Sequence, residues 1–228
     1  MRAATIAFPP RALRDPDTDD RDVDPAAAPA AVNSDEDASQ MTSPLKPPAA
    51  NSFAKFERRT PDGDAMSRLV CTDCGHIHYD NPKIVTGAVI GHEGKVLLAR
   101  RAIHPRKGFW TIPAGYLEEN ETVEAGAARE CMEEAGARIA IDGLLAVYSI
   151  PRISQVQMIY RARLTDGAFS AGPESLEVAL FAWDEIPWAE IAFPSVHWTL
   201  NYWRQTAGQA LGAPFGNPPG ETGDATAR

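Results

Sequence analysis

Seven glutamates crowd into one 22-residue stretch, GYLEENETVEAGAARECMEEAG, between Gly115 and Gly136. The spacing of its apolar residues predicts a helix over 122–135, and on a 3.6-residue wheel Glu130, Glu133 and Glu134 fall on one face. Like charges at these spacings cost about 0.2 to 0.5 kcal/mol per pair in an isolated helix. We therefore expect a cation to offset the repulsion.

Three carboxylates within one helical turn offer the hard oxygen ligands that Mg²⁺ and Mn²⁺ prefer. A solvated acidic face is the common alternative for a run of glutamates. Gly126 is a further signal, because a glycine inside a helix costs about 1 kcal/mol relative to alanine. It leaves room either for a metal-bound phosphate or for tight packing against a neighbouring loop.

The spacing of the surrounding residues favours the metal. Gly115 is followed after five residues by Glu121, after seven more by Arg129 and Glu130, and then by EEAG, which ends at Gly136. This pattern resembles the signature of the Nudix hydrolases at every fixed position. The resemblance implies the α/β fold class, as a Nudix α/β/α sandwich with a mixed sheet, and hydrolysis of a nucleoside diphosphate linked to another group.

The family's roles carry over by position. The residues matching Glu130 and Glu134 bind the divalent ions, Mg²⁺ or Mn²⁺, and the residue matching Glu133 is a further ligand or the base. The backbone at Gly115 adds a carbonyl ligand. The catalytic set that the resemblance implies is Glu133, Glu130, Arg129 and Glu121, with the last two orienting the carboxylates.

Segments outside the signature, such as RLVCTDCGHIHYDNPK and FWTIPAGYLEENE, resemble the plant-type ADP-ribose/FAD pyrophosphatases and their bacterial relatives over residues 60–203. The implied substrate is FAD, giving FMN and AMP, or ADP-ribose, giving AMP and ribose 5-phosphate. Aromatic faces stack on planar bases and arginines pair with phosphates, although aromatic residues more often fill the core. The residues predicted to contact substrate are Arg152, Trp110, Tyr116 and Arg101. Glu174 and Glu177 are loop carboxylates that could act as a base.

That subgroup usually carries a zinc ribbon built from two Cys-x-x-Cys pairs. Here Cys71 and Cys74 form a single pair, whereas a tetrahedral zinc site needs four ligands, with His76 and His78 the nearest others. We expect a degenerate, zinc-ribbon-like segment over 51–82, in which a vestigial pair is favoured over bound zinc.

The rest of the chain divides by composition. Residues 1–50 are rich in Ala, Pro and Asp and are predicted to be disordered. Alternating strand patterns, for example Ile84–Gly91 and Lys95–Arg101, and a closing helix over 195–205 place the Nudix domain at 83–206. Residues 207–228 are rich in Gly and Pro and are predicted to be a flexible tail.

The net charge of −9 over 228 residues argues against nucleic-acid binding, which depends on Lys and Arg. No apolar run reaches the roughly 18 residues of a membrane span. The sequence thus predicts a cytoplasmic enzyme whose partner is a small nucleoside diphosphate derivative, and related enzymes suggest a homodimer.

Two alternative functions fit the sequence less well. NADH pyrophosphatases and RNA-decapping relatives carry SQPWPFPxS after the signature, where this chain reads IPRISQVQMIYRA. Non-catalytic Nudix-type nucleotide sensors usually have an eroded signature and a fused DNA-binding domain, whereas the signature here is intact.

Overall fold

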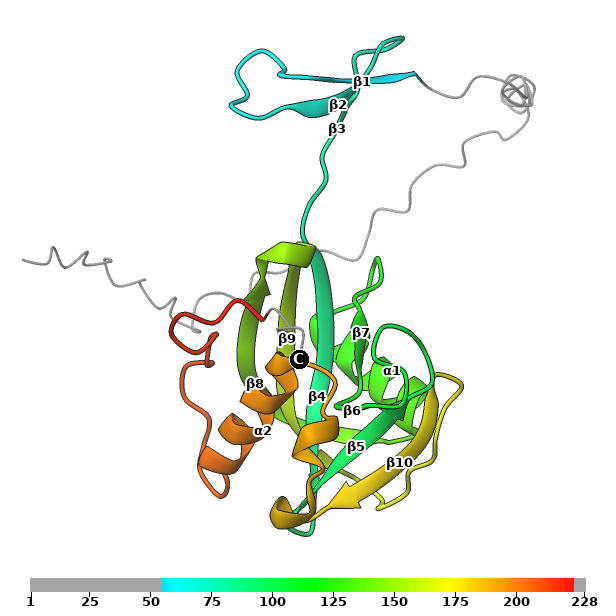
Figure 1. The fold of residues 1–228 in the computed structure, drawn as a ribbon, viewed down its shortest axis with the longest axis vertical. Coiled ribbons are helices and arrows are strands. Elements are labelled where there is room, and N and C mark those ends of the chain that lie inside the picture. Colours follow the sequence, from blue (N-terminus) through cyan, green and yellow to red (C-terminus); the bar gives the residue numbers. More distant parts are fainter. Residues whose placement is uncertain (1–54, 224–228) are drawn as a thin grey trace, which may run out of the picture. The chain divides into compact units, whose positions relative to one another are not determined.

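The computed structural model describes residues 55–223, which form two separate β-sheets and two α-helices (Figure 1). The segment 1–50, predicted to be disordered, lies outside the described residues. Among the described residues no helix is long and apolar enough to cross a membrane.

The first sheet is small and antiparallel. It has the order β1-β2-β3 and is built from β1 (Phe56–Arg59), β2 (Arg68–Cys71) and β3 (Ile77–His78). Arg68 holds its connecting loop, because the Nε donates to Asp64 Oδ2 at 3.0 Å and the guanidinium lies 5.2 Å from the centre of the Tyr79 ring.

The main sheet has seven strands, with the order β10-β5-β4-β9-β8 and two short strands, β6 on β5 and β7 on β4. Central β4 runs parallel to β9 and antiparallel to β5, so the sheet is mixed, as predicted. The strands are β4 (Lys83–His92), β5 (Lys95–Arg101), β6 (Trp110–Thr111), β7 (Ala114–Tyr116), β8 (Ile139–Ile150), β9 (Gln155–Leu164) and β10 (Ser175–Phe181).

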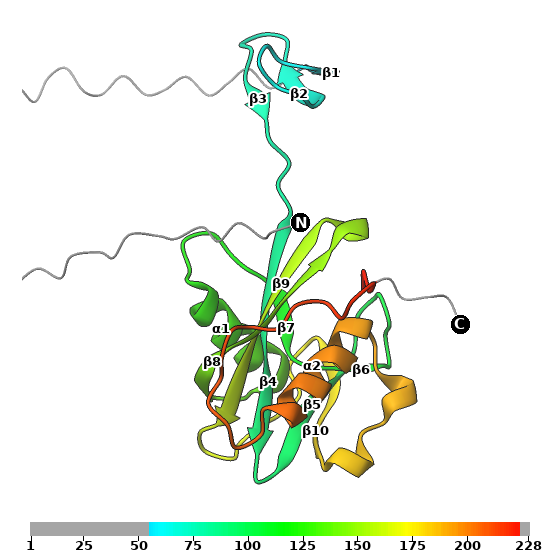
Figure 2. The same cartoon turned by 90° about the vertical axis from the view of Figure 1, so that its left-hand side faces the viewer.

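The helices α1 (Val123–Ala135) and α2 (Pro194–Gln205) lie on opposite faces of this sheet (Figure 2). Alternation along β4 explains the arrangement, because successive side chains of a strand point to opposite faces. Ala88 and Ile90 pack in the core cluster of α1, and Val89 packs in that of α2. The predicted α/β/α sandwich is confirmed. Three 3₁₀ turns complete the regular structure: Pro151–Ile153, Trp183–Glu185 and Trp188–Glu190.

Helix α1 begins and ends where its sequence indicates. The Thr122 side chain accepts a hydrogen bond from the backbone N–H of Ala125 at 3.2 Å, and Gly136 ends the helix with φ of 56°. Cys131 is fully buried in the apolar face of the helix, where a thiol acts as a small hydrophobic side chain. The carboxylates of the other face are thereby held at a fixed height above the sheet.

The flexible tail predicted for 207–228 does not hold for residues 207–223. Phe215 pairs with the exposed edge of β8, where its N–H donates to the Leu145 carbonyl at 2.9 Å and its carbonyl accepts from Val147 N–H at 2.8 Å. Its ring stacks on Tyr202 with centres 4.1 Å apart. The Gly and Pro content of this segment therefore shapes turns along a sheet edge, and residues 224–228 lie outside the described chain.

Candidate active site

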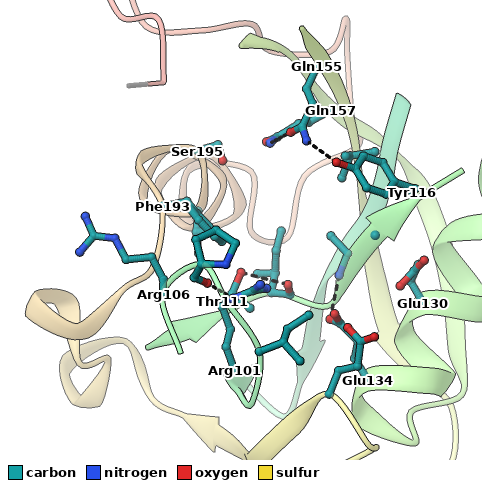
Figure 3. A pocket seen from close by; sticks show the side chains of 18 of the residues that line it. Arg101, Arg106, Thr111, Tyr116, Glu130, Glu134, Gln155, Gln157, Phe193 and Ser195 are labelled. Carbon is teal, nitrogen blue, oxygen red and sulfur yellow. Dashed lines mark hydrogen bonds between the residues drawn. The ribbon is translucent and has the colours of Figure 1, made fainter. Parts of the chain in front are cut away.

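A cavity of about 1040 Å³ opens where β7, the carboxylate face of α1 and the start of α2 meet (Figure 3). Most of the residues singled out in the sequence line it. They are Arg101, Gly115, Tyr116, Arg129, Glu130, Glu133, Glu134, Arg152 and Glu174.

Arg129 is the hub of the acidic face. Its Nε and Nη2 bind both oxygens of Glu121, at 3.1 and 2.7 Å, while Nη1 reaches Glu130 Oε1 at 2.8 Å and Glu133 Oε2 at 3.1 Å. Nη2 also donates to the Tyr116 carbonyl at 3.0 Å. The hydrogen bond from Arg129 lowers the pKa of Glu121. The geometry fits the orienting role predicted for this pair, since a rigid guanidinium fixes three carboxylates at once.

Glu134 and Glu130 are the buried carboxylates, each 8% exposed. Burial raises the pKa of Glu134 to about 7, although the backbone N–H of Ala114 donates to its Oε2 at 3.1 Å. Burial likewise raises the pKa of Glu130, against the opposing effect of Arg129. The negative charges of these two neighbouring, buried carboxylates are therefore only partly balanced by the groups around them.

Gly115 allows the carboxylate of Glu130 to touch the backbone of β7. A methyl group built on Gly115 would overlap the Glu130 carboxylate, so no other residue fits without a shift. This close approach brings a backbone segment and a buried acid together at the place where the family resemblance puts a carbonyl ligand.

The donor set fits a hard divalent cation. Buried Glu130 and Glu134, exposed Glu133 and the nearby charge of Glu174 supply carboxylate oxygens, and Arg129 balances only part of their charge. Within residues 55–223, no three acidic, histidine or cysteine side chains already stand together as a coordination group. The three carboxylates are separated because they have different partners. Arg129 donates hydrogen bonds to Glu130 and Glu133, whereas Glu134 accepts one from the Ala114 backbone.

Gly126 serves packing. A methyl group there would come within 2.8 Å of both Glu121 Oε1 and Thr86 Cγ2. The glycine therefore admits the loop that carries Glu121, and this contact favours the packing alternative over room for a phosphate.

The predicted substrate contacts divide. Arg101, Tyr116 and Arg152 line the cavity, whereas Trp110 is 6% exposed and packs edge-on against Phe181 at 4.9 Å between ring centres. Trp110 is a core residue, because its ring belongs to the buried cluster that also contains Ile191 and Leu200. This burial speaks against the predicted stacking of Trp110 on the substrate.

Two glutamines in the cavity were missed from the sequence. Gln155 Nε2 donates to the Tyr116 hydroxyl at 3.1 Å, and Gln157 Nε2 donates to Gln155 Oε1 at 3.4 Å (Figure 3). They alternate at i and i+2 in QVQ, so both face the same side of β9. That alternation of polar residues at the start of a strand was the available signal.

Of the two acids predicted to lie on a loop, Glu174 precedes β10 and Glu177 lies within it. Glu174 lines the cavity, its backbone is fixed by Ala102 N–H at 2.7 Å, and its charge helps to raise the pKa of Glu130 and of Glu134. Glu177 lies on β10 beside Arg100, 3.8 Å from Nη1. Of the two, Glu174 is the one positioned at the cavity.

The cysteine pair lies in the small sheet. Cys71 is buried at the end of β2, Cys74 is exposed, and backbone N–H groups of Cys74 and Asp73 lower the pKa of Cys71. His78, a predicted neighbour, has its Nε2 3.4 Å from Asp80 Oδ1. Residues 55–223 contain no assembled four-ligand group around the pair.

Comparison with known proteins places the chain in a class. The NUDIX domain model matches residues 81–199, and the model of the Nudix N-terminal zinc ribbon matches residues 54–80. The chain belongs to the Nudix family. A crystal structure of a NUDIX hydrolase from Nitrosomonas europaea is similar over 74% of this chain and 97% of that one, with 46% sequence identity and a TM-score of 0.69.

Three curated relatives are more distant. A "MutT-like protein" of Streptomyces ambofaciens is 36% identical over 45% of this chain and 64% of its own length. An "ADP-ribose pyrophosphatase" of Methanocaldococcus jannaschii is 31% identical over 48% and 67%, and a "NAD-capped RNA hydrolase NudC" of Salmonella heidelberg is 29% identical over 52% and 46%. The chain thus spans between about half and two thirds of the length of these relatives.

Proposed function

We propose that the chain is a Mg²⁺- or Mn²⁺-dependent Nudix pyrophosphohydrolase that cleaves the diphosphate of an ADP-linked compound, ADP-ribose or FAD. The observation that carries the proposal is the shared cavity. It joins the buried carboxylates Glu130 and Glu134 to the arginines Arg101 and Arg152 and to the planar ring of Tyr116. Carboxylates can bind divalent ions, arginines can bind phosphate oxygens, and an aromatic ring can stack on a base, so together these groups suit a nucleoside diphosphate.

Glu130, Glu134 and Glu133, with the backbone at Gly115, would hold the ions. A bound divalent ion neutralises the diphosphate and lowers the pKa of an attacking water molecule. Arg129 keeps these carboxylates in position through its hydrogen bonds. Glu133 is the exposed member of the set and is suited to take a proton from water.

The reaction is a hydrolysis. Water adds to one phosphorus atom of the diphosphate, and the bond from that phosphorus to the bridging oxygen breaks. ADP-ribose yields AMP and ribose 5-phosphate, and FAD yields AMP and FMN. Arg101 and Arg152 line the same cavity and would pair with the phosphate oxygens.

A second candidate is hydrolysis of a NAD-type cap on RNA, which the similarity to NudC favours. The net charge of −9 speaks for a free nucleotide instead, because RNA bodies are held largely by Lys and Arg. A non-catalytic nucleotide sensor is disfavoured by the complete acidic face. Cytoplasmic location and a homodimer remain predictions, to be checked by cell fractionation and light scattering.

The test is a chromatographic screen for AMP formed from FAD, ADP-ribose and NADH and for nicotinamide mononucleotide released from NAD-capped RNA, each with Mg²⁺ and with Mn²⁺. ADP-ribose or FAD is expected to give the highest kcat/KM. Preference for capped RNA over both would replace the proposal with the second candidate.

Glu134→Gln is the active-site variant for this screen, because it keeps the shape of the side chain and removes a ligand charge. Glu119→Gln, at an exposed position outside the cavity, is the matched control. Equal rates for Glu134→Gln and the parent protein would refute the metal assignment.

A further inference from the structure

The C-terminal segment 211–223, called here the C-terminal strap, is tied to the edge of β8 at two successive points. The first is Phe215, whose backbone bonds to Leu145 and Val147 in a parallel bridge. The second is Asn217, whose side-chain oxygen accepts from Ser149 N–H at 2.9 Å and whose Nδ2 donates to the Ser149 carbonyl at 2.8 Å. The Asn217 amide thus continues the pairing after the backbone has turned away.

Hydrogen bonds within the strap also fix its conformation. Asn217 Nδ2 also donates to the Glu221 carbonyl at 3.0 Å, and Glu221 N–H donates to the Pro218 carbonyl at 3.0 Å. These bonds close a turn that sends the chain along β8 toward its last residue, Ile150. In Figures 1 and 2 the red segment follows this course beside β8.

The strap ends at the cavity. Gly223 lines it together with Ile150, and a methyl group built on Gly223 would collide with Ile150 Cδ1. Ile150 is almost fully buried, so part of its cover comes from the strap. A segment remote in sequence from the signature therefore supplies a wall of the same cavity.

This wall belongs to the end of the cavity that is away from the acidic face. Figure 3 shows Gln155 and Gln157 at that end and Glu134 at the other. Aliphatic Ile150 and Ile159 and the two amides line it, which is the chemistry that receives a planar base with hydrogen-bonding edges. If the diphosphate lies at the carboxylates, one of the two groups that it links lies toward the strap, and the two amides there favour the base.

We propose that the C-terminal strap forms the wall of the nucleobase subsite and sets the affinity for the adenosine half of the substrate. The inference rests on the proposed function. It makes Asn217 a positioning residue, since it acts by holding Gly223 against Ile150. The competing explanation is that the strap only shields the edge of β8, as edge strands require. A shielding role predicts a change in stability without a selective change in AMP binding.

The test compares three variants with the parent protein: a truncation after Leu211, Asn217→Ala, and a control truncation after Gly223 that keeps the strap. KM for ADP-ribose is expected to rise about tenfold in the first two, the loss of one contact of base-stacking size, with kcat within about twofold. Competitive inhibition by AMP should weaken by the same factor, while inhibition by ribose 5-phosphate should stay unchanged. The control truncation should match the parent.

Asn217→Ala keeps the Phe215 bridge and serves if the longer truncation does not fold, as judged by circular dichroism. Unchanged KM and AMP inhibition in the folded variants would overturn the proposal, and so would equal weakening by both products. Failure of the proposed function can be distinguished from failure of the strap proposal, because the parent protein itself would then release no AMP from ADP-ribose or FAD. In that case, calorimetric AMP binding to parent and variants still decides the role of the strap.

Discussion

Glu134→Gln should stabilise the metal-free protein at alkaline pH. The pKa of Glu134 is raised by burial from 4.5 to about 7. A folded pKa above the unfolded value means that the favourable contribution of Glu134 is complete below pH 4.5 and is lost as the pH rises through 7. A difference of about 2.5 units at 1.36 kcal/mol each puts the loss at about 3 kcal/mol at pH 8 and above.

Glutamine cannot ionise, and its side-chain oxygen can still accept from Ala114 N–H. In EDTA, the free energy of unfolding of Glu134→Gln should therefore exceed that of the parent by up to about 3 kcal/mol at pH 8, with little difference at pH 4.5. Urea denaturation followed by tryptophan fluorescence at both pH values measures this difference. Glu119→Gln, exposed on the preceding loop, should behave as the parent at both.

Divalent ions should make the parent more stable than Glu134→Gln, the reverse of the order expected in EDTA. The parent should gain stability with rising Mg²⁺ concentration at pH 8, because binding to the folded state alone shifts unfolding, and Glu134→Gln should gain much less. Equal stability of Glu134→Gln and parent at pH 8 in EDTA would show that burial does not raise the pKa of Glu134 to about 7.

Three further substitutions separate positioning from packing. Arg129→Lys keeps the charge but loses the two-point grip on Glu121, so metal affinity should fall about 10- to 100-fold, and a Mn²⁺ titration with parent-like affinity would contradict that role. Gly115→Ala should cost about 1 to 3 kcal/mol of stability and most of the activity because its methyl group overlaps Glu130, while Gly212→Ala, with open space around it, should be neutral in the same thermal melts and assays. Trp110→Ala should lower the free energy of unfolding by about 3 to 5 kcal/mol, as for a core aromatic, and a normal melting temperature with a raised KM would restore its role in substrate contact.

The sheet, the central helix and the acidic face were predictable from the sequence because local patterns specify them. Alternation in β4 and the cap residues around α1 act over a few residues, and the segment from Gly115 to Gly136 runs without interruption from the end of β7 through a loop into α1. Mixed pairing follows from the order of the strands once the fold family is recognised.

The parts that escaped prediction depend on contacts across long separations. Phe215 pairs with β8 some 70 residues earlier in the chain. The sequence of the Gly- and Pro-rich segment does not indicate that it pairs with the edge of a sheet. Trp110 and Tyr116 look alike in sequence, but one faces the core and the other the cavity. Gln155 reaches the site only because β9 lies parallel to β4, which brings its first residues beside β7.

The central claim is that the acidic face of α1 binds the divalent ions required for hydrolysis of an ADP-linked diphosphate. Its most direct test is AMP formation from ADP-ribose in Mg²⁺, measured for the parent and for Glu134→Gln under identical conditions. The parent should form AMP, lose this activity in EDTA and recover it when Mg²⁺ is restored, while Glu134→Gln stays near background. AMP formation by Glu134→Gln at the rate of the parent would contradict the claim.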